Sequence, residues 1–550
     1  MNIHRIFNHR KFCLSTFRNI SIFKTQSYKK MENSFTKRYI PGVIPEIELT
    51  PTESQIINVL NNYTTAYNST LESEQSPITL RITGGWVRDK LLGLPSHDID
   101  IGIDNCSGES FVMGLKEWLE EEKKGTDETI NKIHKIKKNP DKSKHLETCT
   151  TKLFGLDIDF VNLRSESYTD NSRIPTISTG TPYEDSHRRD ATLNALFFNL
   201  STKKIEDLTN KGLEDLANGV LRTPLDPMKT FLDDPLRCLR LIRFASNYGF
   251  AIDQLAIEAM KQSEIKVALE TKISRERIGV EVKKMIINKR GIIGVNDSIE
   301  LLKEVGFSCV FDVGDSKVGD EWIKENDKLL NEDIMKNFDN INKYLIPIVE
   351  SKIINFKGFL NEECDENDRV LFYSCLILNT WRDKMIKIGK KDFYVSYLCE
   401  LNGIKMPAKI SENVSNIVKN IENVRNDIKN VSNFKRSEIA LKFILPFNDK
   451  WGYNLIINCC LEIFENEGSE MISIIEKYKD VFNIIYELKL ENSYNESILL
   501  NGKELMKIIN RKPGPWLKPL NDKLFLWQLD NPGKNKEDMI EYLICMDKNI

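Results

Sequence analysis

Two aspartates spaced two residues apart mark the first place in this chain where metal chemistry could occur. Asp98 and Asp100 fall in the stretch 97–104, where isoleucines alternate with polar residues as in a half-buried β-strand. Residues two apart on a strand point the same way, so these carboxylates would repel each other unless a cation lay between them. Hard oxygen ligands on a rigid strand suit Mg²⁺. We expect Asp98 and Asp100 to bind it, the alternative being a strand with a merely acidic outer face.

A glycine turn comes before this strand. The β-branched run at 78–83 stops at Gly84 and Gly85, where a side chain would block a sharp turn or the close approach of a phosphate group. The spacing of apolar residues over 86–92 predicts a short helix, with Arg88 and Asp89 off its apolar face. Backbone N–H groups in such a turn can bind phosphate. Beside paired carboxylates, the turn indicates metal-assisted phosphoryl or nucleotidyl transfer.

Basic residues gather at the start of a later apolar segment, 186–200. Arg188 and Arg189 precede Asp190, and Asn194 follows four residues further on. We expect this segment to be a helix, with Asp190 and Asn194 on one face and leucine and phenylalanine side chains forming an apolar stripe. A salt-bridged helix start would explain an isolated Arg-Arg-Asp equally well.

A second helix start is expected at Pro235, with Asp234 before it as the N-cap. From there Arg237, Arg240 and Arg243 recur every third residue and therefore occupy one side of the helix. Taken alone, this pattern would fit a capped helix with a solvated arginine stripe.

Together these strings resemble one family. The sequence Gly-Gly-x-Val-Arg-Asp-x-Leu-Leu-Gly at 84–93, followed by Asp-x-Asp at 98–100, resembles the head-domain signature of the class II tRNA nucleotidyltransferases, the CCA-adding enzymes. Residues 188–196 are similar to the Arg-Arg-Asp-x-Thr-x-Asn-Ala-Leu motif of that family, and 233–237 to its Glu-Asp-x-x-Arg element, with aspartate in place of the glutamate. Residues 273–281 resemble its neck motif.

The resemblance covers 78 to about 287 and implies an α+β fold. A polymerase-β-like nucleotidyltransferase head with a mixed sheet would be followed by an all-α neck, body and tail. The expected parts are a targeting peptide (1–30), an N-terminal helical extension (31–77), the head (78–205), a neck with the base-selecting element (206–290), and a helical body and tail that bind tRNA (291–550).

The activity that the resemblance implies is the addition of C, C and A to the 3′ end of tRNA from CTP and ATP, without a nucleic-acid template and with release of pyrophosphate. Asp98 and Asp100 would hold two Mg²⁺ ions, one activating the terminal hydroxyl and one bridging the triphosphate. A strand at 156–163 offers two aspartates, and we choose Asp159 over Asp157 as the third catalytic carboxylate. The implied nucleotide-binding residues are Gly84, Gly85, Arg88, Asp89, Arg189, Asn194, Asp234, Arg237 and Arg240.

Base selection by Asp234 and Arg237 is chemically sensible. Cytosine and adenine both carry an exocyclic amino donor beside a ring-nitrogen acceptor, which a carboxylate and a guanidinium can match. Uracil and guanine present a carbonyl in place of the amine and leave the carboxylate unpaired. Sites that leave a buried polar group unpaired discriminate by roughly 10⁴–10⁵.

Composition limits the remaining possibilities. The chain has 550 residues and a net charge of −3, so two to four domains are expected and any RNA contact must use local basic patches. The scattered cysteines favour free thiols in a reducing compartment. No apolar run reaches the roughly 18 residues of a membrane span. Candidate basic patches are a lysine-rich, flexible loop at 132–145 and a Pro/Gly-broken turn at 508–519 in the tail; a solvated loop is the alternative for each.

The N-terminal 30 residues are basic, amphipathic and free of acidic side chains, as in a mitochondrial targeting peptide; a disordered basic tail is the alternative. Met31 follows immediately. We hypothesise that initiation at Met31 gives cytosolic and nuclear forms, beside a form in the mitochondrial matrix.

Two rival functions remain at this stage. A poly(A) polymerase of the same superfamily would share the head motifs, although the leader and the long helical body count against it. A catalytically silent RNA-binding protein would have no need of intact Asp98, Asp100 and the base-selecting pair. The oligomeric state is not fixed by the sequence, and a monomer is favoured.

Overall fold

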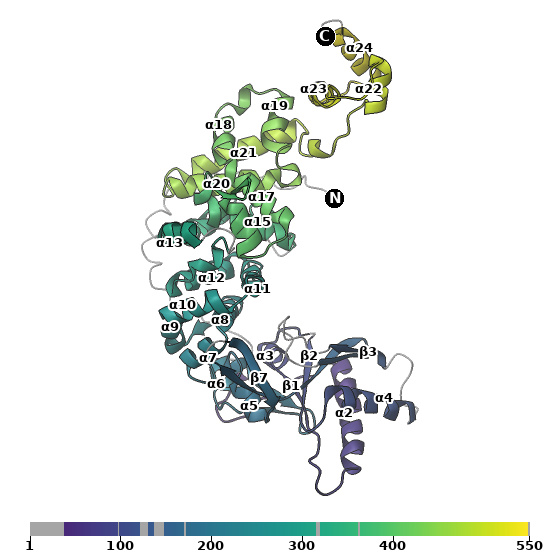
Figure 1. Ribbon diagram of the computed structural model, residues 1–550, viewed down its shortest axis with the longest axis vertical. Helices are drawn as coiled ribbons and strands as arrows, with labels where there is room; N and C mark the ends of the chain where they lie inside the picture. Colours follow the sequence, from purple (N-terminus) through teal and green to yellow (C-terminus); the bar gives the residue numbers. More distant parts are fainter. Residues whose placement is uncertain are drawn as a thin grey trace.

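The computed structural model describes residues 38–96, 98–121, 130–136, 148–169, 172–314, 320–360 and 363–547. Its elements form an arc, with a mixed α/β head at one end and the C-terminal helices at the other (Figure 1). The expected targeting peptide and Met31 lie outside the described residues. Among the residues that are described, no helix is long and apolar enough to cross a bilayer.

The head is built on a seven-stranded sheet in the order β3-β4-β5-β2-β1-β8-β9. Strands β2 and β5 are parallel and the other neighbours antiparallel, which confirms the expected mixed sheet. Residues Asp100 and Asp159 are register partners on β2 and β5. The strand bounds are β1 Leu80–Thr83, β2 Ile99–Ile103, β3 Ile130–Ile136, β4 Thr148–Leu153, β5 Leu156–Asn162, β8 Phe197–Asn199 and β9 Lys204–Glu206.

Helices α2 (Pro51–Ser69) and α4 (Gly108–Glu121) pack together beside this sheet. Glu53 forms a capping box with Thr50 at the start of α2, and its carboxylate accepts hydrogen bonds from the Trp86 indole (3.1 Å) and the Lys90 ammonium (2.6 Å) of α3 (Gly85–Leu92). The helix of the predicted N-terminal extension (31–77) therefore packs against the head.

Two local expectations in the head are wrong. The segment 186–200 is not a helix: α5 (Pro182–His187) ends before it, a 3₁₀ turn spans Thr192–Asn194, and β8 follows. Its apolar residues are buried on both sides of the sheet, so they form a continuous run that periodicity alone cannot distinguish from a helix. The start of the lysine-rich segment, 132–136, belongs to β3 rather than to a loop, and 137–145 lies outside the described residues.

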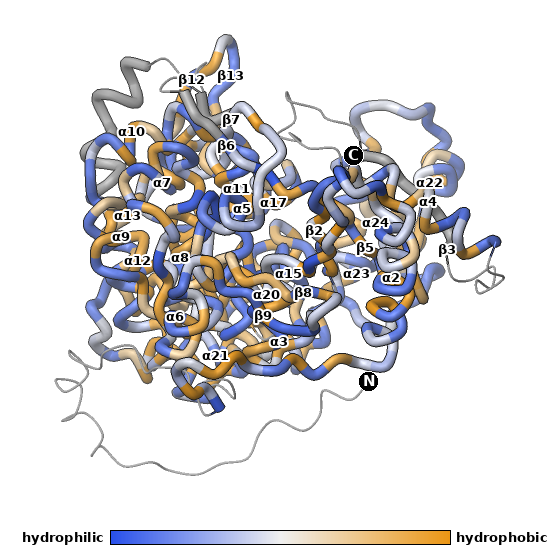
Figure 2. Tube along the Cα trace, turned by 90° about the horizontal axis from the view of Figure 1, so that it is seen from below, coloured by the Kyte–Doolittle hydropathy of each residue, from blue (hydrophilic) through white to orange (hydrophobic). Residues whose placement is uncertain are grey.

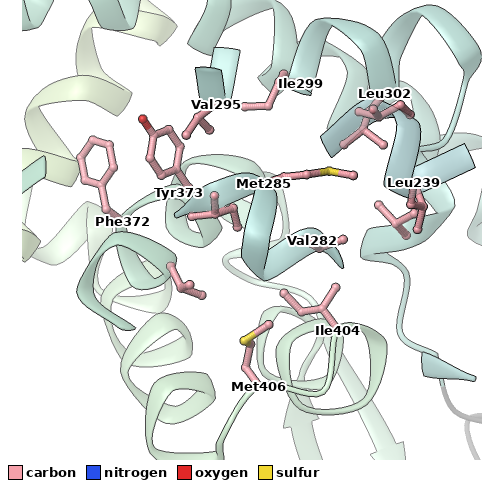
Figure 3. Packing of buried hydrophobic residues seen from close by; sticks show 14 of the residues in the cluster. Leu239, Val282, Met285, Val295, Ile299, Leu302, Phe372, Tyr373, Ile404 and Met406 are labelled. Carbon is pink, nitrogen blue, oxygen red and sulfur yellow. The ribbon is translucent and has the colours of Figure 1, made fainter. Parts of the chain in front are cut away.

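The neck and body are mostly helical, and one continuous apolar core runs through both. Figure 3 shows Leu239 of α8, Val282 and Met285 of α11 and side chains of α12 packing toward Phe372 and Tyr373 of α15. The neck helices are α6 Gly212–Asn218, α7 Pro227–Asp233, α8 Leu236–Tyr248, α9 Gln254–Met260, α10 Ser263–Lys272 and α11 Arg275–Ile286. The body helices are α12 Gly291–Val305, α13 Asp320–Glu350, α14 Lys357–Leu360, α15 Glu366–Leu378, α16 Val395–Leu398, α17 Ala408–Lys419, α18 Ile421–Ile428, α19 Arg436–Ile439, α20 Trp451–Glu465 and α21 Met471–Glu487.

The junction of neck and body brings two backbones into direct contact. A Cβ atom on Gly279 of α11 would lie 1.8 Å from the carbonyl oxygen of Ile404, which follows the π-helix Cys399–Gly403. Arg275, at the start of α11, donates hydrogen bonds to the Cys309 carbonyl (3.1 Å) and to Asp312 (2.6 Å). Any larger residue at position 279 would push α11 away from the body.

Three small two-stranded sheets add to the predicted architecture. The hairpin β6 (Arg164–Thr169) and β7 (Ser172–Thr179) leaves the head, β10 (Val220–Leu221) pairs with β11 (Ala251–Ile252) in the neck, and β12 (Met385–Ile388) pairs with β13 (Lys391–Tyr394) in the body. The fold class is confirmed, but the neck and body are not purely α-helical.

The tail forms a small lobe with its own apolar core. Leu500, Leu505, Leu520, Leu524 and Met539 belong to a cluster separate from that of the head, neck and body. The lobe contains α22 Gly502–Ile509, α23 Leu517–Asp530 and α24 Lys536–Asp547, and the predicted basic turn joins the first two.

Candidate active site

A cavity of about 670 Å³ lies where the head meets the neck. Its wall is made by the turn after β1, by β5 and β6, by the segment around the 3₁₀ turn, and by the starts of α8 and α11. Most of the predicted site residues meet here although they are far apart in the sequence: Gly84, Gly85, Arg88, Asp100, Asp159, Arg189, Asn194, Asp234, Arg237 and Arg240 all line the cavity.

Two predicted residues do not line it. Asp98 is exposed immediately before β2, next to the wall formed by Asp100. Asp89 accepts hydrogen bonds from Arg88 (2.8 Å) and from the Tyr248 hydroxyl (3.1 Å). The structure therefore places Asp89 behind Arg88, as a residue that orients the guanidinium rather than one that faces the cavity.

The carboxylates of β2 and β5 interact with one another. Burial raises the pKa of Asp100, and Asp159 and Asp98 raise it further, while Arg189 opposes them. Thr150 donates a 2.5 Å hydrogen bond to Asp159, which fixes that side chain on β5. Among the described residues no group of three His, Cys, Asp or Glu is arranged to hold a metal ion. A cation would nevertheless relieve the repulsion at Asp100, and the oxygen donors present are those that a hard divalent ion prefers.

The predicted glycine turn is confirmed and has a specific spatial role. Gly84 has a φ of 71°, and a Cβ atom there would lie 3.2 Å from a guanidinium nitrogen of Arg189. A Cβ atom on Gly85 would lie 3.2 Å from a guanidinium nitrogen of Arg88. The two glycines thus leave room for two arginine side chains at the cavity wall. The predicted short helix, α3, follows directly.

Arg88 is held from several sides. It donates hydrogen bonds to Asp89 and to the side-chain oxygen of Asn194, and its guanidinium lies 5.2 Å and 4.9 Å from the ring centres of Phe244 and Tyr248. Burial alone would lower the pKa of Arg88, but the tyrosine and nearby aspartates raise it overall. The result is a fixed positive charge in the cavity wall.

Arginine–aspartate pairs organise the neighbouring wall. Asp190 accepts hydrogen bonds from Asn194 (2.9 Å) and Arg240 (2.6 Å). Asp185 pairs with both Arg188 and Arg189. Burial would raise the pKa of Asp185, but Arg189 and Arg188 overcome it and lower the pKa to about 2. These aspartates stay ionised and hold the arginines in place.

Asp234 and Arg237, the predicted base-selecting pair, are also held by neighbours. Arg277 of α11 donates hydrogen bonds of 2.9 Å and 3.4 Å to the two carboxylate oxygens of Asp234. Arg237 reaches toward the Thr230 carbonyl (3.4 Å) and toward Glu166 (3.7 Å). Helix α8 begins at Leu236, one residue after the predicted start, so its N-cap is Pro235 and not Asp234, and no side chain caps it. The Leu236 amide donates a hydrogen bond of 3.3 Å to the Asp234 carboxylate.

Sequence reasoning missed several residues of the cavity wall. Asp185 lies three and four residues before the arginines that it pairs with, and this helical spacing could have identified it. Arg277 belongs to the neck motif, none of whose residues is among the predicted site residues. Glu166 lies on β6, a strand that was not expected, and pairs with Arg164 and Arg188. No local pattern in the sequence points to Glu166.

Comparisons with known proteins agree with this architecture. Residues 80–222 match the family described as "Poly A polymerase head domain". The chain is similar to the mitochondrial CCA tRNA nucleotidyltransferases of Saccharomyces cerevisiae, with 38% identity over 91% of this chain and 94% of the relative, and of Candida glabrata, with 41% identity over 92% and 97%.

Solved structures have the same fold. The Bacillus stearothermophilus CCA-adding enzyme in complex with CTP matches with a TM-score of 0.55 and 17% identity, over 91% of this chain and 100% of that one. The Thermotoga maritima CCA-adding enzyme complexed with tRNA matches with a TM-score of 0.55 and 18% identity, over 92% and 99%. High identity over nearly the full length of the yeast enzymes settles the relationship: the chain belongs to the CCA tRNA nucleotidyltransferase family.

Proposed function

We propose that the cavity between head and neck adds C, C and A to the 3′ end of tRNA, using CTP and ATP and releasing pyrophosphate. One observation carries this assignment. Asp100 of β2 and Asp159 of β5 share a cavity with the Asp234–Arg237 pair of the neck, so carboxylates that suit nucleotidyl transfer and a pair that can recognise a base face the same space. A poly(A) polymerase would use similar head residues, but the extended identity is to CCA-adding relatives.

The residues of the cavity suit successive parts of a nucleoside triphosphate. The turn at Gly84 and Gly85, with Arg88 and Arg189, would bind the triphosphate through backbone N–H groups and guanidinium charge. Asn194 and Arg240, which both bind Asp190, line the same cavity and would contact the sugar. Asp234 would accept a hydrogen bond from the exocyclic amine of cytosine or adenine, and Arg237 would donate to the ring.

The carboxylate residues face the position of bond formation. In the reaction the 3′ oxygen of tRNA attacks the α-phosphorus, and the bond to pyrophosphate breaks. Asp159, held by Thr150, would accept a hydrogen bond from the attacking hydroxyl group and orient it. Asp98 and Asp100 are the residues that would hold Mg²⁺, which supplies the positive charge that a triphosphate and an ionising hydroxyl require.

The tail lobe is proposed to bind the rest of the tRNA. Its first helix, the turn after it and the start of α23 carry exposed basic side chains with few acids between them: Lys503, Lys507, Arg511, Lys512, Lys518 and Lys523. Phosphate groups along an RNA backbone match such a surface.

For localisation, we propose that the basic leader at 1–30 directs the enzyme to the mitochondrial matrix, as the names of the yeast relatives suggest for those proteins. A product that starts at Met31 would remain in the cytosol and nucleus. Replacing Met31 should remove those two pools and leave the mitochondrial one; survival of all pools would contradict this.

The function is tested by primer extension on tRNA transcripts that end at the discriminator base, at C or at C-C. Each of the four nucleotides is supplied with Mg²⁺, first separately and then together. We expect two C additions, one A addition and then a stop. A growing A tail would instead establish a poly(A) polymerase, and tight tRNA binding without extension would establish a silent RNA-binding protein.

The site assignment has its own test. Asp98→Ala should abolish turnover and leave tRNA binding nearly intact, because the carboxylate would act only on the metal. Normal extension by this variant would remove Asp98 from the metal site. Asp157→Ala is a matched control, since Asp157 lies on β5 with its side chain largely exposed and pairs with Lys152 outside the cavity.

A further inference from the structure

The aromatic ring of Phe244, on α8, lines the catalytic cavity. Hydrophilic residues recur among hydrophobic ones along α8 (Figure 2), and Phe244 is one of the hydrophobic residues, only 6% exposed. The ring nevertheless has three guanidinium groups around it, whose central carbons lie 4.2 Å (Arg243), 5.2 Å (Arg88) and 5.5 Å (Arg240) from the ring centre. The packing of an apolar core does not require cations at such positions.

Two of these arginines belong to the proposed nucleotide site. Arg88 comes from α3 of the head and Arg240 from α8 of the neck, and both line the cavity. Guanidinium groups that lie close together repel one another, most strongly where water is excluded. The negative face of an aromatic ring attracts cations and offsets part of that repulsion. Phe244 can therefore hold together positive charges that come from two parts of the molecule.

Each of the three arginines is also paired with a carboxylate: Arg88 with Asp89, Arg240 with Asp190 and Arg243 with Glu281. These acids fix the guanidinium groups by hydrogen bonds but offset much of their charge. An aromatic ring has no formal charge, so it attracts the same groups without repelling a triphosphate. This difference explains why an aromatic residue, rather than another acid, suits this place in the cavity wall.

The next turn of α8 extends the contact to a second ring. Tyr248 stacks on Phe244, with 6.2 Å between the ring centres and 15° between the ring planes. The Arg88 guanidinium lies 4.9 Å from the Tyr248 ring centre, so Arg88 of the head meets two successive rings of the neck. Of these two rings, Phe244 is the one that lines the cavity and also contacts Arg240.

We propose that Phe244 is a positioning residue for nucleotide binding, whose ring holds Arg88 and Arg240 where they meet the triphosphate and the sugar. This inference rests on the proposed function. The triphosphate and the ribose are common to CTP and ATP, so the ring should increase the affinity for both nucleotides and leave the choice of base to Asp234 and Arg237. A residue that merely filled the core would act through its shape alone.

The test separates the charge distribution of the ring from its shape. Phe244→Leu keeps an apolar side chain but removes the aromatic face, and Phe244→Tyr restores that face. Phe338→Leu is the matched control, since Phe338 of α13 lies in the body, is 0% exposed and contacts the Phe311 ring edge to face at 5.9 Å. A thermal melt of each variant shows whether it is folded.

For Phe244→Leu we expect the KM for CTP and the KM for ATP to rise together by about tenfold to thirtyfold, the size of one or two lost cation–π contacts. The kcat should stay within about threefold, and the KM for tRNA and the discrimination among nucleotides within about twofold, because the lost interaction is made in the ground state as well. Phe244→Tyr should restore the KM to within about threefold of the parent. Phe338→Leu should lose stability and keep the parental KM values.

Fluorinated phenylalanines at position 244 separate the two roles most sharply. Successive fluorine atoms withdraw electron density from the ring face and leave its shape nearly unchanged, so they weaken cation binding step by step. The logarithm of the KM for CTP and for ATP should rise with each added fluorine at position 244 and stay constant for the same series at position 338. A constant KM across the series at position 244 would overturn the proposal even if Phe244→Leu raised the KM, because shape alone would then explain the effect.

Failure of this inference is distinct from failure of the proposed function. A constant KM across the fluorinated series would be recorded in an enzyme that still adds CCA to tRNA. If the parent protein adds no CCA to tRNA, the proposed function itself is wrong, and the role of Phe244 falls with it.

Discussion

Two buried acids, one in the cavity wall and one in the body, behave in opposite ways. Asp190 is 7% exposed and Glu400, on the π-helix beside the neck, is 0% exposed. Burial raises the pKa of Asp190, but Arg240 and Asn194 pull it far below its usual range. Burial raises the pKa of Glu400 to about 7, and only the Ser374 hydroxyl opposes it. Among the described residues, no arginine or lysine pairs with Glu400.

The difference shows what distinguishes the site from the rest of the core. Burial by itself favours a neutral carboxylic acid, whereas the arginines beside Asp185 and Asp190 in the cavity wall keep those two acids ionised. Charged groups that are already fixed in place need little rearrangement when a charged ligand binds. Such preorganised charges give strong electrostatic binding and catalysis. Glu400 has no such arrangement and therefore serves the body only as a buried polar group.

The largest effect is expected from removing Arg240, the cation beside Asp190, because Asp190 would then be a buried acid without a cationic partner at hydrogen-bond distance, as Glu400 is. Arg240→Gln should lower kcat/KM for CTP and ATP by about 10²–10³ and cost about 2–4 kcal/mol of unfolding free energy, since the carboxylate stays buried without its partner. Arg290→Gln is the control, because it breaks the ion pair to Asp297 outside the cavity. The control should lose stability with kcat/KM near the parent value; equal losses of activity in both would contradict the assignment.

The converse experiment replaces the buried Glu400 of the body with glutamine, which has nearly the same shape and no charge. Glu400→Gln should stabilise the protein by about 2–3 kcal/mol at pH 8, where the parent must hold an ionised carboxylate or take up a proton on folding. The ordinary value is 4.5 and the folded value about 7, so the parent loses stability as the pH rises between them. The gain in the variant should vanish near pH 4.5. Urea unfolding at pH 4.5 and 8 measures it; an equal difference at both pH values would show that titration is not the cause.

Replacing Arg277 tests whether its hydrogen bonds to Asp234 contribute to selectivity among the four nucleotides. Arg277→Gln removes both hydrogen bonds that orient Asp234, so we expect misincorporation of UTP and GTP, relative to CTP and ATP, to rise about tenfold. Arg275 lies two residues earlier on α11 and contacts Cys309 and Asp312 instead of Asp234. Arg275→Gln should therefore leave selectivity among nucleotides unchanged. A uniform loss of rate with selectivity preserved would give Arg277 a purely structural role.

The smallest effects are expected where charges are exposed and solvated. Replacing Lys503 and Lys507 of the tail with glutamine should raise the KM for tRNA about twofold to fivefold and change the unfolding free energy by less than about 0.5 kcal/mol. The KM effect should shrink as salt is added. Lys261→Gln, which breaks an exposed ion pair to Glu304, is a control that should not change the KM. A salt-independent effect would argue against phosphate contact by the tail.

Features that depend on short, regular spacing were predictable from the sequence. The alternation around Asp98 and Asp100 gave β2, Gly84 and Gly85 gave the turn, and the Asp234–Pro235 step gave the start of α8 to within one residue. In these cases the backbone conformation is decided by the residues themselves.

Features that depend on tertiary contacts were not predictable. The sequence around strand β8 resembles a helix because both faces of the strand are buried, which removes the two-residue period of a half-buried strand. Glu166 entered the cavity on an unexpected hairpin, and its partners Arg164, Arg188 and Arg237 come from three different segments. Arg277 and Asp234 are 43 residues apart in the sequence, so their hydrogen bond depends on the tertiary fold.

The contact between Gly279 and Ile404 has a mechanical consequence. Apolar side chains between two helices form a layer that can be compressed or sheared, but here one backbone touches the other with no side chain between them. The joint is therefore stiff, and α11 moves with the body as a single piece. Because α11 also carries Arg277, whose hydrogen bonds orient the Asp234 carboxylate, a shift of the body relative to the head would also shift the partner of that carboxylate.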